Sequence, residues 1–293
     1  MSSYRFCRSD DIALLADALN RCWSPYFPGE PAVTPASFKR SIRDLQIWCS
    51  SCMVAFSGSD PIGVLIGAKR PSGTLVHKIA VHPDHRRQGH GRHLLASLGS
   101  KLAILGPPRI IAEVPETLAP ACELFSASGY VQESLLTDYV LQCEGPSNRA
   151  EFPRSLGAGD HDAGFVIPAT VDDLAANDLL GEAHPQVCWE RSVETLTARK
   201  DDIEGLAVAS DERIEAYVLY VSSTGEIVSL RSFIDDGGAR LKQLLSRLGM
   251  GTFRFPKVNP AELSKECLQM LGFRPAGGHR LYAATLRQGS GSP

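Results

Sequence analysis

Residues 81–95 constrain the fold of this chain more than any other part of its sequence. A short apolar run at 75–81 leads into a basic stretch with two glycines, and leucines at helical spacing follow. That order predicts a strand, a tight loop and a helix. Gly89 and Gly91 let the loop approach a ligand closely, and the first turn of the helix offers free N–H groups to an anion. We therefore predict that the loop binds a pyrophosphate.

Three arginines, Arg86, Arg87 and Arg92, add formal positive charge to the same loop. Two well-known phosphate loops do not fit it. The P-loop ends in Gly-Lys-Ser/Thr, which does not occur here, and the dinucleotide fingerprint requires a third glycine where this chain has Leu94.

The spacing Arg86-x-x-Gly89-x-Gly91 instead resembles the acetyl-CoA signature of the GNAT N-acetyltransferase superfamily, Arg/Gln-x-x-Gly-x-Gly/Ala. Residues 4–142 are similar to that fold throughout: two helices, a hairpin, a strand, the phosphate loop, then helix, strand, helix and strand. The resemblance implies an α/β protein with the α+β GNAT fold, in which helices flank a mixed, mostly antiparallel central sheet. It also implies that the fourth and fifth strands diverge and leave a slot for the pantetheine arm.

The same pattern starts again in the second half of the chain. Asp172-Asp173-Leu174 repeats Asp10-Asp11-Ile12, and Tyr139 and Tyr282 each lie ten positions after a glycine. We predict two tandem GNAT-like domains with a period of roughly 140–160 residues. The predicted ranges are 1–142 for an acetyl-CoA-binding domain, 143–163 for a linker, 164–287 for a degenerate domain and 288–293 for a disordered tail.

The second copy departs from the family at its loop. Asp235 and Asp236 stand there in place of arginines, and the glycine motif is absent. Carboxylates beside a pyrophosphate would repel it. Gly237-Gly238 leaves room for some ligand, but the favoured interpretation is a degenerate domain that packs on the first.

Composition narrows the class of protein and its partners. The 293 residues carry a formal net charge of −3, which favours neither nucleic acid nor an acidic surface. No segment reaches the roughly 20 apolar residues of a membrane span, and the N-terminus lacks an apolar signal core. We expect a cytoplasmic monomer or homodimer without membrane or nucleic-acid partners.

Cysteine and histidine spacings do not predict a metal. Cys49-x-x-Cys52 is the one close pair among 8 cysteines, and no second pair completes a zinc site. The favoured interpretation is two reduced cysteines near the start of a strand. Four histidines lie around the turn without a paired carboxylate or cysteine, which favours a solvated basic loop; they are His82, His85, His90 and His93.

The resemblance implies which residues contact acetyl-CoA, the expected co-substrate. Backbone groups of the fourth strand would pair with the pantetheine amides, and amides of the loop would hold the pyrophosphate. These cofactor-binding residues are Ile79, Ala80, Val81, Arg86, Arg87, Gln88, Gly89, His90, Gly91 and Arg92.

For the general base we choose His77, with Glu113 on the fifth strand as the other candidate. Relatives with a catalytic glutamate carry it at the position of Leu75 here, whereas those with a histidine carry it at His77. Strand alternation predicts that Leu75, His77, Ile79 and Val81 share one face. An ordinary imidazole pKa of about 6.5 suits proton removal near neutral pH, although an edge residue without a role is equally compatible with the sequence.

Family members usually carry a tyrosine as general acid at the position where this chain has Phe125. They carry an asparagine earlier in the same motif, where this chain has Leu118. Tyr130 and Tyr139 are possible substitutes, although both fit a core position. A thiol with a pKa of about 8.5 also leaves readily as thiolate without a proton donor.

The acceptor site is expected beside Trp23, Tyr26 and Phe27, in the connection between the first two helices. These rings either form a wall for the acceptor or anchor the loop.

The preferred function is transfer of an acetyl group from acetyl-CoA to a primary amine of a small molecule or peptide, catalysed by the N-terminal domain. Two alternatives stay open: a CoA-binding sensor or scaffold without turnover, and an acetyltransferase similar to mycothiol synthase.

Overall fold

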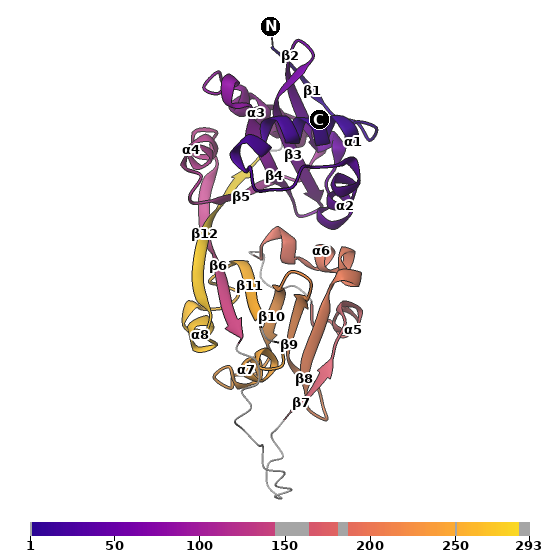
Figure 1. The fold of residues 1–293 in the computed structure, drawn as a ribbon, viewed down its shortest axis with the longest axis vertical. Coiled ribbons are helices and arrows are strands. Elements are labelled where there is room, and N and C mark those ends of the chain that lie inside the picture. The colour runs from indigo at the N-terminus through magenta and orange to yellow at the C-terminus, as the bar shows by residue number, and fades with distance from the viewer. Residues whose placement is uncertain (1, 144–163, 181–186, 250, 287–293) are drawn as a thin grey trace, which may run out of the picture. The chain divides into compact units, whose positions relative to one another are not determined.

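The computed structural model describes residues 2–143, 164–180, 187–249 and 251–286, which form two compact units (Figure 1). Unit 1 comprises Met1–Ser134 and Arg280–Pro293, and unit 2 comprises Leu135–His279. The compact units are therefore divided differently from the predicted ranges 1–142 and 164–287. The predicted linker, apart from Cys143, and the predicted tail lie outside the described residues.

Unit 1 follows the predicted order of helices and strands. Its elements, with short 3₁₀ helices labelled η, are β1 (Ser2–Phe6), α1 (Ile12–Cys22), η1 (Ser24–Tyr26), α2 (Pro35–Leu45), η2 (Cys49–Ser51), β2 (Met53–Ser57), β3 (Asp60–Arg70), β4 (Gly73–Val81), η3 (Pro83–His85), α3 (His90–Leu105), β5 (Arg109–Pro115), α4 (Ala119–Ala127) and the start of β6 (Val131–Cys143). The sheet runs β1-β2-β3-β4-β5-β12.

Unit 2 repeats this order in shorter form. Its elements are β7 (Phe165–Pro168), α5 (Val171–Ala176), η4 (Trp189–Arg191), α6 (Val193–Ala198), η5 (Lys200–Asp202), β8 (Glu204–Ala209), β9 (Ile214–Val221), β10 (Glu226–Ser232), α7 (Ala239–Leu245), β11 (Gly251–Val258), α8 (Lys265–Met270) and the start of β12 (Arg274–Thr285). The sheet runs β6-β11-β10-β9-β8-β7. The predicted fold class, a mixed sheet flanked by helices and present twice, is confirmed.

Helix α3 shows why the local sequence forms these elements. Its buried face carries the predicted leucines Leu94, Leu95, Leu98 and Leu102, which pack into the core of unit 1. The helix ends at Gly106, where a Cβ would lie 2.3 Å from a Leu102 methyl carbon. None of the helices in the described ranges has the length and apolar character needed to cross a bilayer.

In each unit one parallel strand pair is very short. β4 and β5 pair in parallel at Thr74–Ile110 and Leu75–Ile111, whereas β3 and β4 pair antiparallel along nearly their whole length. β10 and β11 repeat this arrangement with a parallel register at Glu226–Arg254. The predicted divergence of the fourth and fifth strands therefore begins beyond Leu75 and Ile111.

A β-bulge at His77 changes the faces predicted for β4. Gly67 of β3 lies opposite Val76 and Ile66 lies opposite Lys78, so β4 contains one extra residue, His77, at this point. Ile79 consequently packs against the same apolar cluster as Val76. The prediction that Ile79 shares a face with Leu75 and His77 is wrong, because a bulge shifts the alternation of side chains by one residue.

The last strands of the two halves are exchanged. β6 and β12 each begin in one unit and end in the other, and Figure 1 shows the yellow β12 ending beside β5. Tyr282, from the second half of the sequence, therefore packs in the core of unit 1, whereas Tyr139 packs in the core of unit 2. Each core is completed by a strand from the other half of the chain.

We predict that Tyr282→Ala destabilises the protein by about 3–5 kcal/mol, as expected for removing a buried aromatic ring. Tyr282 is 2% exposed and stacks on Phe125 with ring centroids 5.8 Å apart. Ile104→Ala is the control, because Ile104 is 82% exposed. Denaturant unfolding measures both variants, and equal stabilities would contradict the contribution of β12 to the core of unit 1.

Candidate functional site

The predicted phosphate loop joins β4 to α3 in unit 1. Gly89 has a φ of 86° and precedes the first turn of α3. The first hydrogen bond of the helix runs from the His93 N–H to Gly89 O. The N–H groups of the first helical residues consequently have no acceptor within α3 and point out of its end. A Cβ built on Gly89 meets no atom within 4 Å, so the space in front of these amides is open.

Gly91 has a different reason for lacking a side chain. A Cβ at this position would lie 3.1 Å from a methyl carbon of Leu124, on α4. Gly91 therefore allows α3 and α4 to pack closely, and its role in bringing the loop close to a ligand stays a prediction. Of the two loop glycines, Gly89 is the one that combines a left-handed backbone with open space.

The three arginines of the loop are exposed and arranged differently from one another. Arg86 lies over the Tyr26 ring, 5.7 Å from its centroid, and Arg92 donates a hydrogen bond to Ala127 O at the end of α4. Arg87 has a φ of 63°, an uncommon backbone conformation for a residue with a side chain. The sequence did not predict this positive φ.

His90 begins α3 with its side chain buried. Its Nδ1 lies 2.6 Å from the Tyr4 hydroxyl, and burial, followed by the nearby charges of His85 and His93, lowers its pKa. The imidazole is therefore neutral near pH 7, and only its backbone N–H faces the loop end of the helix. Across the described ranges no group of three histidine, cysteine or acidic residues is placed to hold a metal ion.

Both candidate bases lie at the closed end of the diverging strands. His77 in the β4 bulge and Glu113 on β5 each come two residues after the last parallel pair, Leu75–Ile111. Both are half-buried. The two strands therefore present an imidazole and a carboxylate where the slot between them begins.

Phe125, at the position expected for a tyrosine acid, is buried on α4. Two tyrosines contact its ring: Tyr130 edge-on at 5.2 Å between centroids, and Tyr282 stacked at 5.8 Å. Burial raises the pKa of Tyr130 to about 12, and its hydroxyl has no hydrogen-bond partner in the described part of the chain. Tyr139, the other substitute considered, belongs to the core of unit 2.

The predicted acceptor residues gather beside β4. Trp23 stacks on Phe27 with centroids 4.4 Å apart, and the Tyr26 hydroxyl donates to Val81 O at 2.7 Å. Glu30 and Lys78 complete this group, although neither was identified from the sequence. Glu30 and Lys78 are 48 residues apart in the sequence, so only the fold brings them together.

The cysteines of the Cys49-x-x-Cys52 motif are free. Cys52 is fully buried, which raises the pKa of its thiol, and its Sγ lies 3.4 Å from Trp48 O. A side chain on Gly67 would collide with Ser51 O, because the η2 turn lies directly against β3. The motif therefore helps to pack η2 and carries no sign of reactivity.

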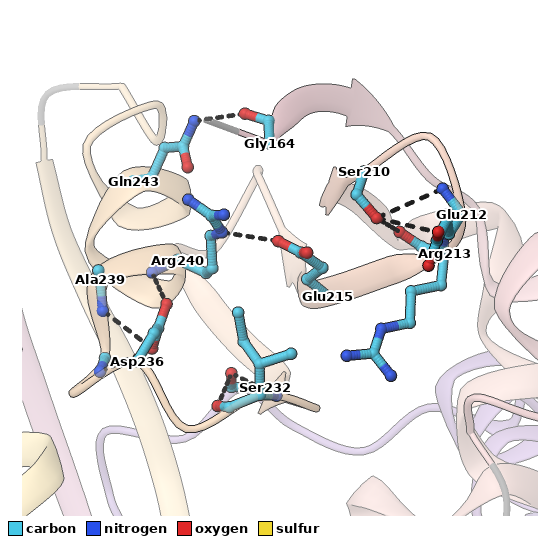
Figure 2. A network of polar contacts seen from close by, with 12 residues as sticks. Gly164, Ser210, Glu212, Arg213, Glu215, Ser232, Asp236, Ala239, Arg240 and Gln243 are labelled. Carbon is cyan, nitrogen blue, oxygen red and sulfur yellow. Dashed lines mark hydrogen bonds and ion pairs between the residues drawn. The ribbon is translucent and has the colours of Figure 1, made fainter. Parts of the chain in front are cut away.

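In unit 2 a side chain occupies the anion position of the equivalent loop. The Asp236 carboxylate accepts hydrogen bonds from the N–H groups of Gly238, Ala239 and Arg240, at 2.9, 3.1 and 2.7 Å. Figure 2 shows Asp236 beneath Ala239 and Arg240, with the Arg240–Glu215 ion pair next to it. The start of α7 is thus satisfied by the protein's own carboxylate.

A cavity of about 450 Å³ lies beside this loop in unit 2. Tyr217, Ser229 and Arg231 contribute polar atoms to its wall, and Leu263 and Met270 contribute apolar ones. The loop residues 235–238 close one end. The cavity itself was not predicted, because its walls come from segments scattered between Leu180 and Met270.

Residues 14–130 match the sequence model of the acetyltransferase (GNAT) family. Three solved structures illustrate the similarity of the whole fold. They are a GCN5-related N-acetyltransferase from Sphaerobacter thermophilus (16% identity, 98% of this chain and 96% of that one, TM-score 0.64), a tandem GNAT protein from the clavulanic acid biosynthesis pathway (16%, 98% and 99%, 0.61) and a GCN5-related N-acetyltransferase from Anabaena variabilis (9%, 98% and 73%, 0.64). A search of curated proteins found no match.

We predict that Asp236→Ala lowers the free energy of unfolding by about 1 kcal/mol, the usual effect of losing a side chain that caps a helix. The matched control is Asp235→Ala, which removes an exposed carboxylate from the adjacent position. Denaturant unfolding compares the two variants with the wild type. Equal stability of all three would show that the Asp236 contacts do not hold the loop.

Proposed function

This chain belongs to the GNAT acetyltransferase family and carries the family's fold twice, and we propose that unit 1 transfers the acetyl group of acetyl-CoA to a primary amine of a small molecule or peptide. The observation that supports this proposal most strongly is the open anion site at the start of α3. Gly89 leaves the space in front of the helix amides free, and Arg86 and Arg87 are exposed beside it. Unit 2 has its own carboxylate at the corresponding position.

The residues of unit 1 fit acetyl-CoA in both charge and shape. The amides of His90, Gly91 and Arg92 and the adjacent arginines would hold the pyrophosphate. Backbone groups within Ile79, Ala80 and Val81 would pair with the pantetheine arm. Bound acetyl-CoA supplies an activated thioester carbonyl to the slot.

The protein's part in the reaction is to orient the amine and to accept its proton. A protonated amine has no lone pair for attack, so a base must receive the proton near the closed end of the slot. His77 is our first choice and Glu113 our second, because both lie there. Orientation by the surrounding walls contributes the remainder of the rate increase.

A second function, a CoA-binding sensor without turnover, is favoured by one observation. Phe125 lacks a hydroxyl. The hydroxyl of the adjacent Tyr130 is buried, and this burial raises its pKa to about 12. A search of primary amines for release of free CoA thiol separates the two functions. It also separates a broad amine acetyltransferase from an enzyme similar to mycothiol synthase.

We predict that the full-length chain binds one CoA and that Gly89→Asn weakens binding about tenfold or more. Asparagine tolerates a positive φ, so the backbone is preserved while a side chain enters the space in front of the amides. Gly237→Asn is the matched control, because Gly237 also has a positive φ and open surroundings, but in unit 2. Titration calorimetry should show a loss of affinity for the first variant only; equal losses would place the site elsewhere.

We predict that His77→Ala lowers kcat by roughly 10²-fold, the usual scale for losing a positioned base. Wild-type kcat should rise with pH through one ionisation near neutrality, and the affinity for CoA should stay nearly constant in the variant. Measuring kcat against pH for both proteins tests this role. Superimposable profiles would remove His77 from the mechanism and favour Glu113.

A further inference from the structure

An ammonium group already lies in the aromatic loop next to β4, and it belongs to the protein. Lys78 Nζ lies 4.4 Å from the centroid of the Trp23 ring and 3.4 Å from Glu30 Oε2. The indole Nε1 of Trp23 donates to the same carboxylate oxygen at 3.0 Å. One aromatic face and one carboxylate thus surround a single positive charge.

This arrangement has the features of a site that recognises a primary ammonium. Aromatic faces attract cations through their quadrupole, with indole the strongest of the natural rings. The carboxylate supplies the opposite charge, and the Trp23 N–H holds it in position. Phe27 stacks on the indole ring of Trp23, with centroids 4.4 Å apart.

The carboxylate is more accessible to solvent than the lysine that contacts it. The Glu30 side chain is 46% exposed, whereas that of Lys78 is 22% exposed. A cation arriving from solvent therefore reaches Glu30 and the edge of Trp23 directly. Lys78 is anchored on β4 next to the His77 bulge, so the subsite lies beside the closed end of the slot.

We propose that Trp23 and Glu30 form an ammonium subsite for the acceptor, that Lys78 occupies this subsite before the acceptor binds, and that the acceptor is a diamine or another primary amine with a second positive charge. The inference rests on the proposed acetyltransferase function and specifies its substrate class. One amine of the acceptor replaces Lys78 at Glu30, and the other lies in the slot as the nucleophile. Lys78 then acts as an internal competitor.

The test uses three acceptors in the full-length protein: 1,4-diaminobutane, butylamine and 4-aminobutanoate. Lys78→Met removes the competitor and keeps the length of the side chain, and Glu30→Gln removes the charge and keeps the shape. Lys200→Met and Asp172→Asn are charge-matched controls, since Lys200 and Asp172 form an exposed ion pair in unit 2. KM is measured from the release of CoA thiol.

For 1,4-diaminobutane we expect KM to fall about three- to tenfold in Lys78→Met and to rise by a similar factor in Glu30→Gln, the scale of one exposed ion pair with a cation–π contact. Butylamine should show no change in either variant, and the control variants should match the wild type. If instead Lys78→Met weakens binding of 4-aminobutanoate, Lys78 recognises an acceptor carboxylate and the proposal is wrong. Identical KM values for all proteins would show that Trp23, Glu30 and Lys78 only anchor the loop, which would also contradict the proposal.

A direct binding measurement separates this proposal from the proposed function. Calorimetric titration of 1,4-diaminobutane in the presence of CoA reports on the subsite whether or not any amine is acetylated. We expect the affinity order Lys78→Met, wild type, Glu30→Gln, from tightest to weakest. Absence of thiol release with every amine would contradict acetyl transfer, whereas equal diamine affinities in the three proteins would overturn the subsite.

Discussion

The short parallel contact between β4 and β5 is the constraint on which the candidate site depends. Two register pairs hold the strands together, and beyond Leu75 and Ile111 they diverge. Backbone groups on the diverging side of β4 are then available to a ligand instead of to a neighbouring strand. The bulge at His77 lies where this divergence starts, and it places an imidazole at the closed end of the slot.

The exchange of the last strands gives each half of the sequence a part in the core of the other half. Tyr282 and its neighbours complete the core of unit 1, and Tyr139 completes the core of unit 2. Each half of the sequence therefore contributes an aromatic residue to the core formed mainly by the other half. In unit 2 the Asp236 carboxylate satisfies three N–H groups around the start of α7.

Local pattern and spacing predicted the tandem fold, the leucine face of α3 and the loop around Gly89. They did not predict the bulge at His77, because the register between β3 and β4 is decided by the assembled sheet. Alternation then assigned Ile79 to the wrong face. The packing of Gly91 against Leu124 was also not predicted, because it depends on the position of α4.

Two features could not be predicted from the sequence for the same physical reason. They are the exchange of β6 and β12 and the cluster of Trp23, Glu30 and Lys78. A strand's own residues specify its extended backbone and its buried face, but the edge on which it pairs is decided by the assembled sheet. Similarly, Glu30 and Lys78 are unremarkable charged residues in the sequence. Only the folded loop brings them to one indole ring.

A crystal structure of the full-length chain with acetyl-CoA tests the central claim most directly. The account predicts pyrophosphate density at the amides of His90, Gly91 and Arg92, and a pantetheine arm along β4 from Val81 towards His77. It also predicts that the Asp236 carboxylate keeps its three N–H contacts in unit 2. Acetyl-CoA bound in unit 2, with the loop at Gly89 empty, would contradict the assignment of the active site.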